Sequence, residues 1–75
     1  MKSDKLLDAK GLACPMPIVR TKKAMNELES GQILEVHATD KGFKSDLAAW
    51  SKSGGHDILE QAEDGDVLKF WVQKG

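Results

Sequence analysis

A second cysteine is absent from this chain of 75 residues, so no disulfide can form within it. Cys14 is its only thiol, and a reducing compartment is the natural setting for such a chain. No stretch approaches the roughly 18 apolar residues of a membrane-spanning helix, and the N-terminal "MKSDKLLDAKG" contains no signal-peptide core. We therefore expect a cytoplasmic protein that is not inserted in a membrane.

An excess of either charge is absent too. Lysine and arginine total 11 against 12 for aspartate and glutamate, a formal net charge of −1, so direct nucleic-acid binding is not expected. Hydrophobic residues make up 40% and charged residues 31%, the balance of a globular protein. The length predicts one domain over residues 1–75, close to the smallest size that folds on a hydrophobic core alone.

Signatures of metal and cofactor sites are missing as well. The one cysteine and the two scattered histidines, His37 and His56, do not have the spacing of a metal site. The glycines of "KSGGHD" lack the strand-to-helix context of a phosphate-binding loop. The sequence therefore predicts neither a metal nor a cofactor.

Two segments have helical periodicity. The first is expected to begin at Pro15 and to stop at Gly31. Its inward stripe comprises Ile18, Thr21, Met25 and Leu28. The second is expected over residues 43–53, before Gly54 and Gly55. Its stripe comprises Phe43, Leu47 and Trp50.

Four segments are predicted to be strands, over residues 5–9, 32–40, 56–63 and 66–74. A tight turn at Asp64 and Gly65 predicts that the last two form an antiparallel hairpin. Alternation along the second and fourth segments indicates which side chains face the core, namely Leu34, Val36, Ala38, Leu68, Phe70 and Val72.

The order β-α-β-α-β-β predicts an α+β fold, a two-layer α/β sandwich with a four-stranded mixed sheet and two helices on one face. The right-handed crossover rule places both helices on one face if the two connections move in opposite directions across the sheet. The other sheet face then stays open and carries Ile33, His37, Lys69 and Trp71. Trp71 is either a partly exposed residue of an ordinary sheet face or part of a docking surface.

The prolines around Cys14 suggest why the thiol lies there. If the first helix begins at Pro15, Cys14 is its N-cap, and Pro15 and Pro17 stiffen a first turn whose amides have no intrahelical partner. The positive end of the helix dipole then favours a thiolate. Cys14 is thus expected to be a nucleophile or a sulfur carrier, and the alternative is a buried cysteine that acts as a small hydrophobe.

Other side chains close to Cys14 in the sequence could assist it. Lys10, Arg20, Lys22 and Lys23 would add positive potential for docking. His56 could serve as a base for Cys14, or it could be a solvated loop histidine.

The segment "DAKGLACPMPIVRTKKAM", residues 8–25, resembles the signature of the TusA family of small sulfur carriers, also called SirA-like proteins. The family hallmark is a Cys-Pro-x-Pro motif that opens the first helix after a Gly-Leu turn. The later segments "LEVHATDKG", "DLAAWSKSGGH" and "LKFWVQKG" are also similar to the family. The resemblance implies a two-layer α/β sandwich of four strands and two helices, which agrees with the order read from the periodicity.

The resemblance further implies that Cys14 accepts sulfane sulfur as a persulfide and passes it to an acceptor protein. A cysteine desulfurase or a rhodanese-type protein would be the donor. Asp8, Gly11 and Leu12 match the family's approach to the motif, with Gly11 as a turn, Leu12 in the core and Asp8 either holding the loop or ending the strand. The chain would be a carrier with a covalent intermediate rather than a stand-alone turnover enzyme.

Two other classes of function remain open from the sequence. One is a redox-sensing adaptor in which Cys14 is oxidised or forms a mixed disulfide. The other is a binding module that acts through its surface, as related two-layer folds do, with Cys14 incidental. The pathway that receives the sulfur, whether thiolated tRNA, molybdenum cofactor, selenium or inorganic sulfur metabolism, is also open.

Overall fold

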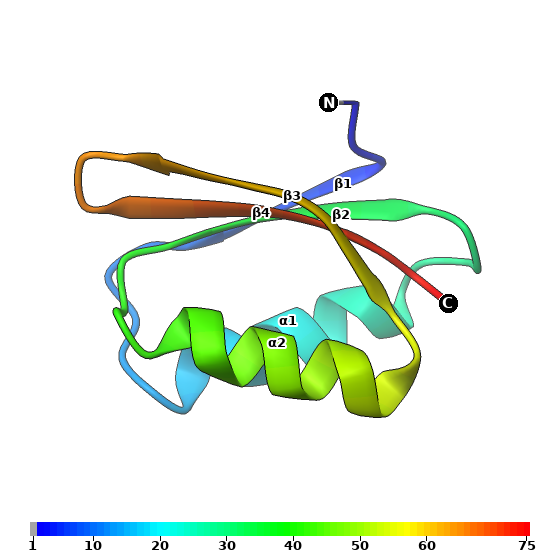
Figure 1. The fold of residues 1–75 in the computed structure, drawn as a ribbon, viewed down its shortest axis with the longest axis horizontal. Coiled ribbons are helices and arrows are strands. Elements are labelled where there is room, and N and C mark those ends of the chain that lie inside the picture. Colours follow the sequence, from blue (N-terminus) through cyan, green and yellow to red (C-terminus); the bar gives the residue numbers. More distant parts are fainter. Residues whose placement is uncertain (1) are drawn as a thin grey trace.

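A computed structural model describes residues 2–75 and has the expected order of elements. Its helices are α1, Met16–Asn26, and α2, Phe43–Gly54. Its strands are β1, Lys5–Ala9, β2, Ile33–Ala38, β3, Asp57–Asp64, and β4, Val67–Gln73. Figure 1 shows the four strands as one layer and both helices packed beneath it. The predicted α+β sandwich is confirmed.

The sheet is mixed, with strand order β1-β2-β4-β3. β2 pairs in parallel with β1 and antiparallel with β4, and β4 also pairs antiparallel with β3. Both helical connections, from β1 to β2 and from β2 to β3, therefore move in the same direction across the sheet. Crossovers of one hand that move the same way leave their helices on the same face. The two helices do share a face, as expected, but the condition stated for it, connections that move in opposite directions, is wrong.

The helix-facing side of the sheet is the hydrophobic core. Leu34, Val36 and Ala38 of β2 are buried, as the alternation predicts. On β4, Phe70 and Val72 are buried, while Leu68 is half-buried against the core. The predicted stripe of α2 is confirmed as well, with Phe43 and Leu47 buried and Trp50 packed at the margin of the core.

The ends of α1 differ from the prediction. The amide of Val19 donates to the Pro15 carbonyl at 3.1 Å, so Pro15 is the N-cap and Cys14 lies one residue outside the helix. At the other end, the amide of Glu27 bonds to carbonyls of the preceding turn and caps the helix. Gly31, with φ of 91°, lies in the loop before β2 instead of ending the helix.

The open face of the sheet carries a polar cluster around Glu35. Its carboxylate accepts hydrogen bonds from Trp71 Nε1 at 3.0 Å, His37 Nε2 at 2.6 Å and Ser3 Oγ at 3.2 Å. Burial by itself would raise the pKa of Glu35, but the hydrogen bonds from His37, Ser3 and Trp71 outweigh it and lower the pKa below its ordinary value. Trp71 is thus half-buried and engaged within its own sheet.

This cluster predicts how stability depends on pH. A carboxyl whose folded pKa is depressed contributes stability above its unfolded pKa, about 4.3 for glutamate, and loses that contribution as the pH falls through the lower folded pKa. We expect Glu35→Gln to cost about 1–3 kcal/mol of unfolding free energy at neutral pH, with the difference shrinking in acid. Urea unfolding from neutral to acidic pH measures it. The exposed Glu29→Gln is the control, and an equal loss in both variants would contradict the assignment.

Both termini lie at one end of the sheet. The amide of Asp4 donates to the Ile33 carbonyl and the amide of Lys74 donates to the Gln32 carbonyl, each at 2.8 Å, so both chain ends flank the start of β2. The loop from β1 to α1 lies at the opposite end, on the left in Figure 1. Over residues 2–75, neither helix has the length and apolarity needed to cross a bilayer.

Candidate functional site

Two loops meet at the end of the sheet where β1 and β2 stop. The amide of Gly11, in the β1–α1 loop, donates to Thr39 Oγ1 in the β2–α2 loop at 2.9 Å. Gly11 has φ of 81°, a conformation that a residue with a Cβ rarely adopts. Asp8 Oδ1 accepts from the amide of Lys10 at 3.1 Å and so closes the turn just after β1.

Cys14 is exposed between two anchored residues. Leu12 is half-buried against the core before it, and Pro17 is buried after it, where its carbonyl accepts from Thr21 Oγ1 at 2.8 Å. Pro15 is exposed, and the Cys14–Pro15 peptide bond is cis. The alternative of a buried structural cysteine is therefore wrong, because the thiol lies at the surface.

The thiol of Cys14 donates a hydrogen bond to Asp46 Oδ2 at 3.6 Å. Asp46 lies in the first turn of α2, and Asp40 lies in the loop just before that helix. Loss of water around the sulfur and the negative charges of Asp46 and Asp40 all raise the pKa of the Cys14 thiol. The carboxylates therefore oppose the effect of the positive end of α1, which was expected to favour a thiolate. Of these causes of the raised pKa, the two carboxylates are the ones that a substitution can remove.

A shallow groove of about 470 Å³ runs between the two helices and contains the sulfur. The α1 side is lined by Cys14, Pro15, Ile18 and Lys22, and the α2 side by Asp46, Ala49, Trp50 and Ser53. Of the four basic residues that the sequence predicts to assist docking, Lys22 lines this groove. Lys10, Arg20 and Lys23 are exposed but do not line it.

His56 is engaged elsewhere. Its ring stacks on Trp50 with centroids 4.8 Å apart, and its Nδ1 accepts from the amide of Gly75 at 3.1 Å. It follows Gly55, the C-cap of α2, whereas the thiol is bonded to Asp46 in the first turn of that helix. The structure therefore pairs Cys14 with a carboxylate and not with His56.

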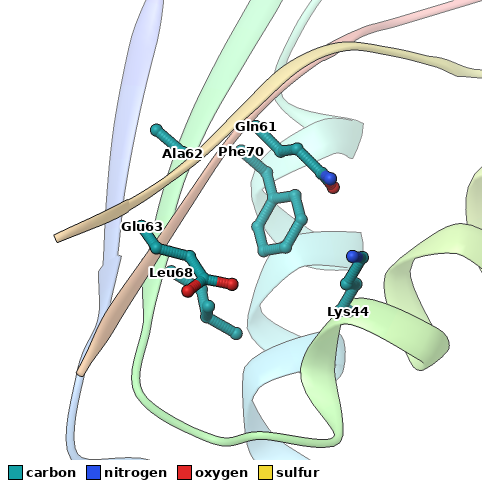
Figure 2. A pocket seen from close by; sticks show the side chains of 6 residues that line it. All are labelled: Lys44, Gln61, Ala62, Glu63, Leu68 and Phe70. Carbon is teal, nitrogen blue, oxygen red and sulfur yellow. The ribbon is translucent and has the colours of Figure 1, made fainter. Parts of the chain in front are cut away.

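A smaller cavity of about 160 Å³ lies away from the thiol, between the start of α2 and the β3–β4 hairpin. Figure 2 shows the Phe70 ring at its wall, with Lys44 approaching from α2 and Glu63 from β3. No residue proposed from the sequence for the site lines it. Among residues 2–75, no group of three histidine, cysteine, aspartate or glutamate side chains is arranged to hold a metal ion.

Sequence reasoning missed Asp46 and Asp40. They are remote from Cys14 along the chain, and only the packing of α2 beside α1 brings them together. One signal was present: parallel crossovers start their helices at the same end of the sheet. A carboxylate in the first turn of the second helix, "FKSD", is therefore expected near the start of the first.

Comparisons with known proteins bear on this site. The family model described as Sulfurtransferase TusA matches residues 5–74. The chain is 87% identical to the YrkI protein of Bacillus subtilis over 75 residues, the whole of both chains. It is 45% identical over 71 residues to a protein of Allochromatium vinosum named sulfur carrier protein TusA, covering 95% of this chain and 93% of that one. The crystal structure of a SirA-like protein from Desulfitobacterium hafniense matches with a TM-score of 0.83 and 29% identity, covering 95% of this chain and 97% of that one.

Proposed function

The chain belongs to the TusA family and is a sulfur carrier, and from this premise we propose that Cys14 carries sulfane sulfur as a persulfide. The donor class is a cysteine desulfurase or a rhodanese-type protein, each of which presents a persulfide. The acceptor is a second protein with a nucleophilic thiol. The observation that carries the proposal is an exposed thiol, alone in the sequence, in a groove open to a partner.

The transfer is balanced without an added oxidant or reductant. The Cys14 thiolate attacks the terminal sulfur of the donor persulfide, and a new bond forms between Sγ and that sulfur. The sulfur–sulfur bond of the donor breaks, and its electron pair leaves with the donor cysteine as a thiolate. The proton that Cys14 gave up is available to this thiolate through solvent. An acceptor thiolate then repeats the step on the Cys14 persulfide.

Neighbouring residues have supporting roles in this proposal. Gly11 and Asp8 shape the loop before the thiol, and Leu12 anchors it to the core. Pro15 caps α1 and Pro17 fixes its first turn, so the sulfur stays at the groove. Lys22 contributes positive charge where a partner would dock, while Lys10, Arg20 and Lys23 act at longer range on encounter.

Intact-protein mass spectrometry under non-reducing conditions tests the proposal. After incubation with a cysteine desulfurase and cysteine, we expect wild-type protein to gain the mass of one sulfur atom and to lose it on reduction. Cys14→Ser treated in the same way should gain nothing. Rhodanese-type donors and polysulfide are tried in parallel, since one donor could be the wrong partner.

Folded wild-type protein that takes no sulfur from any of these donors, while its thiol titrates normally, would overturn the proposal. The redox-sensing adaptor would then be the better reading. It predicts that Cys14 forms a mixed disulfide or is oxidised without carrying sulfane sulfur.

A further inference from the structure

Cys14 lines the groove together with Asp46, and the charge of Asp40 also acts on its thiol. Asp46 Oδ2 accepts the hydrogen bond from its thiol, and Asp40 Oδ2 is buried without a hydrogen-bond partner in the described part of the chain. Lys22 of α1 is the cationic side chain that lines the same groove. Even so, Asp46 makes no salt bridge within residues 2–75. Its negative charge is therefore unpaired at the surface beside the thiol.

This arrangement stabilises the protonated sulfur. A carboxylate can accept a hydrogen bond from a thiol, but it repels a thiolate at the same distance. Since the thiolate is the nucleophile in alkylation, oxidation and persulfide exchange, the free carrier is held in its less reactive form. Between its donor and its acceptor a carrier meets other electrophiles, and a protonated thiol reacts with them more slowly.

The same contact must change when sulfur is loaded. A cation brought to Asp46 would form an ion pair with the carboxylate, weaken its hold on the thiol proton and offset its repulsion of a thiolate. The groove is shallow and open, so a lysine or arginine side chain of a docked protein can reach Asp46. The charge required of the partner at Asp46 is thus positive, whereas a partner group that paired with Lys22 would be negative.

Building on the proposed persulfide function, we propose that Asp46 is a positioning residue that keeps Cys14 protonated in the free carrier, and that a sulfur donor activates Cys14 by placing a lysine or arginine against Asp46. Asp40 reinforces the effect through its charge. Docking and activation of the thiol are then one event, and transfer is confined to partners with the correct cation.

A purely structural role for Asp46 makes a different prediction. An acidic residue in the first turn of a helix is stabilised by the helix dipole, so Asp46 could serve α2 alone. In that case Asp46→Asn would lower stability slightly and leave the reactivity of Cys14 unchanged. The experiment must therefore measure the titration and reactivity of the Cys14 thiol, together with the urea midpoint of each variant.

The first measurement is the ultraviolet titration of the Cys14 thiolate in wild type, Asp46→Asn and Asp57→Asn. Asp57 is an exposed carboxylate at the start of β3, at the end of the sheet away from Cys14, and serves as the control for charge. For Asp46→Asn we expect a titration midpoint at lower pH than in wild type. We also expect alkylation by iodoacetamide at neutral pH to be at least about twofold faster than in wild type. An unchanged midpoint in folded Asp46→Asn would overturn the positioning role.

The second measurement compares two sulfur donors on the same variants. Polysulfide carries no cation, so it should load Asp46→Asn faster than wild type. A cysteine desulfurase should load Asp46→Asn more slowly, because its cation has lost its carboxylate partner. Faster loading of Asp46→Asn by both donors would overturn activation by a cation.

Failure of the proposed function is distinguishable from failure of this inference. If wild type accepts sulfur from no donor, the persulfide role fails, and activation by a donor fails with it. If wild type is loaded but the thiol of Asp46→Asn titrates and reacts as in wild type, only the role of Asp46 fails.

Discussion

A Cys14→Ser variant should pass no sulfur from donor to acceptor and yet should compete with wild-type carrier for the donor. A hydroxyl forms no persulfide, so transfer should fall to the background seen without carrier. The residue is exposed and outside α1, so the substitution leaves the groove and its docking contacts intact. Added in large excess, the variant should therefore suppress the loading of wild type, as measured by intact mass.

The comparison separates the carrier from a surface-only binding module. In a module of that kind, the serine variant would support the downstream activity as well as wild type does. The urea midpoint of Cys14→Ser, expected to match wild type, shows that any loss comes from chemistry and not from unfolding. Transfer of sulfur by Cys14→Ser at an appreciable rate would show that Cys14 Sγ is not the atom that carries the sulfur.

Phe70→Ala should remove a large part of the stability of the fold. Phe70 is 2% exposed, and its ring meets that of Phe43 edge to face with centroids 5.6 Å apart. It also walls the 160 Å³ cavity of Figure 2, so its removal would enlarge a space that already exists. Loss of such a side chain costs about 3–5 kcal/mol, against roughly 4–11 kcal/mol for a domain of this length.

Urea unfolding followed by far-ultraviolet circular dichroism measures this loss. Leu6→Ala is the matched control, because Leu6 is 57% exposed on β1 and its truncation leaves the core intact. The control is expected to change the free energy of unfolding by less than about 1 kcal/mol. Similar losses in the two variants would show that the core is not centred on the helix-facing side of the sheet.

The strands and the core were predictable because their signal is local. Alternation along β2 depends on the sequence of that segment alone, and Leu34, Val36 and Ala38 are buried as it requires. The start of α1 was less certain. Pro15 lacks an amide hydrogen and so suits the N-cap as well as the first helical position, and only the structure shows which carbonyl accepts the first helical hydrogen bond.

The site was predictable in part. The two prolines beside Cys14 indicated a functional thiol at the start of a helix, and the structure places that thiol at the surface. The carboxylates of Asp46 and Asp40, which raise its pKa, were not foreseen. Asp46 is 32 positions from Cys14, and no local pattern reports such a contact. The same limit applies to the basic residues, because neighbours in sequence such as Lys22 and Lys23 face different surroundings on a helix.

The position of the chain ends has a consequence for tethering. Both termini lie at the start of β2, while the loop with the thiol lies at the other end of a molecule whose longest dimension is 29 Å. A protein fused to either end would begin on the side remote from the sulfur. At about 3.3 Å per extended residue, its linker would need about nine residues to bring it to Cys14. Linker length would then set the effective concentration of a fused donor.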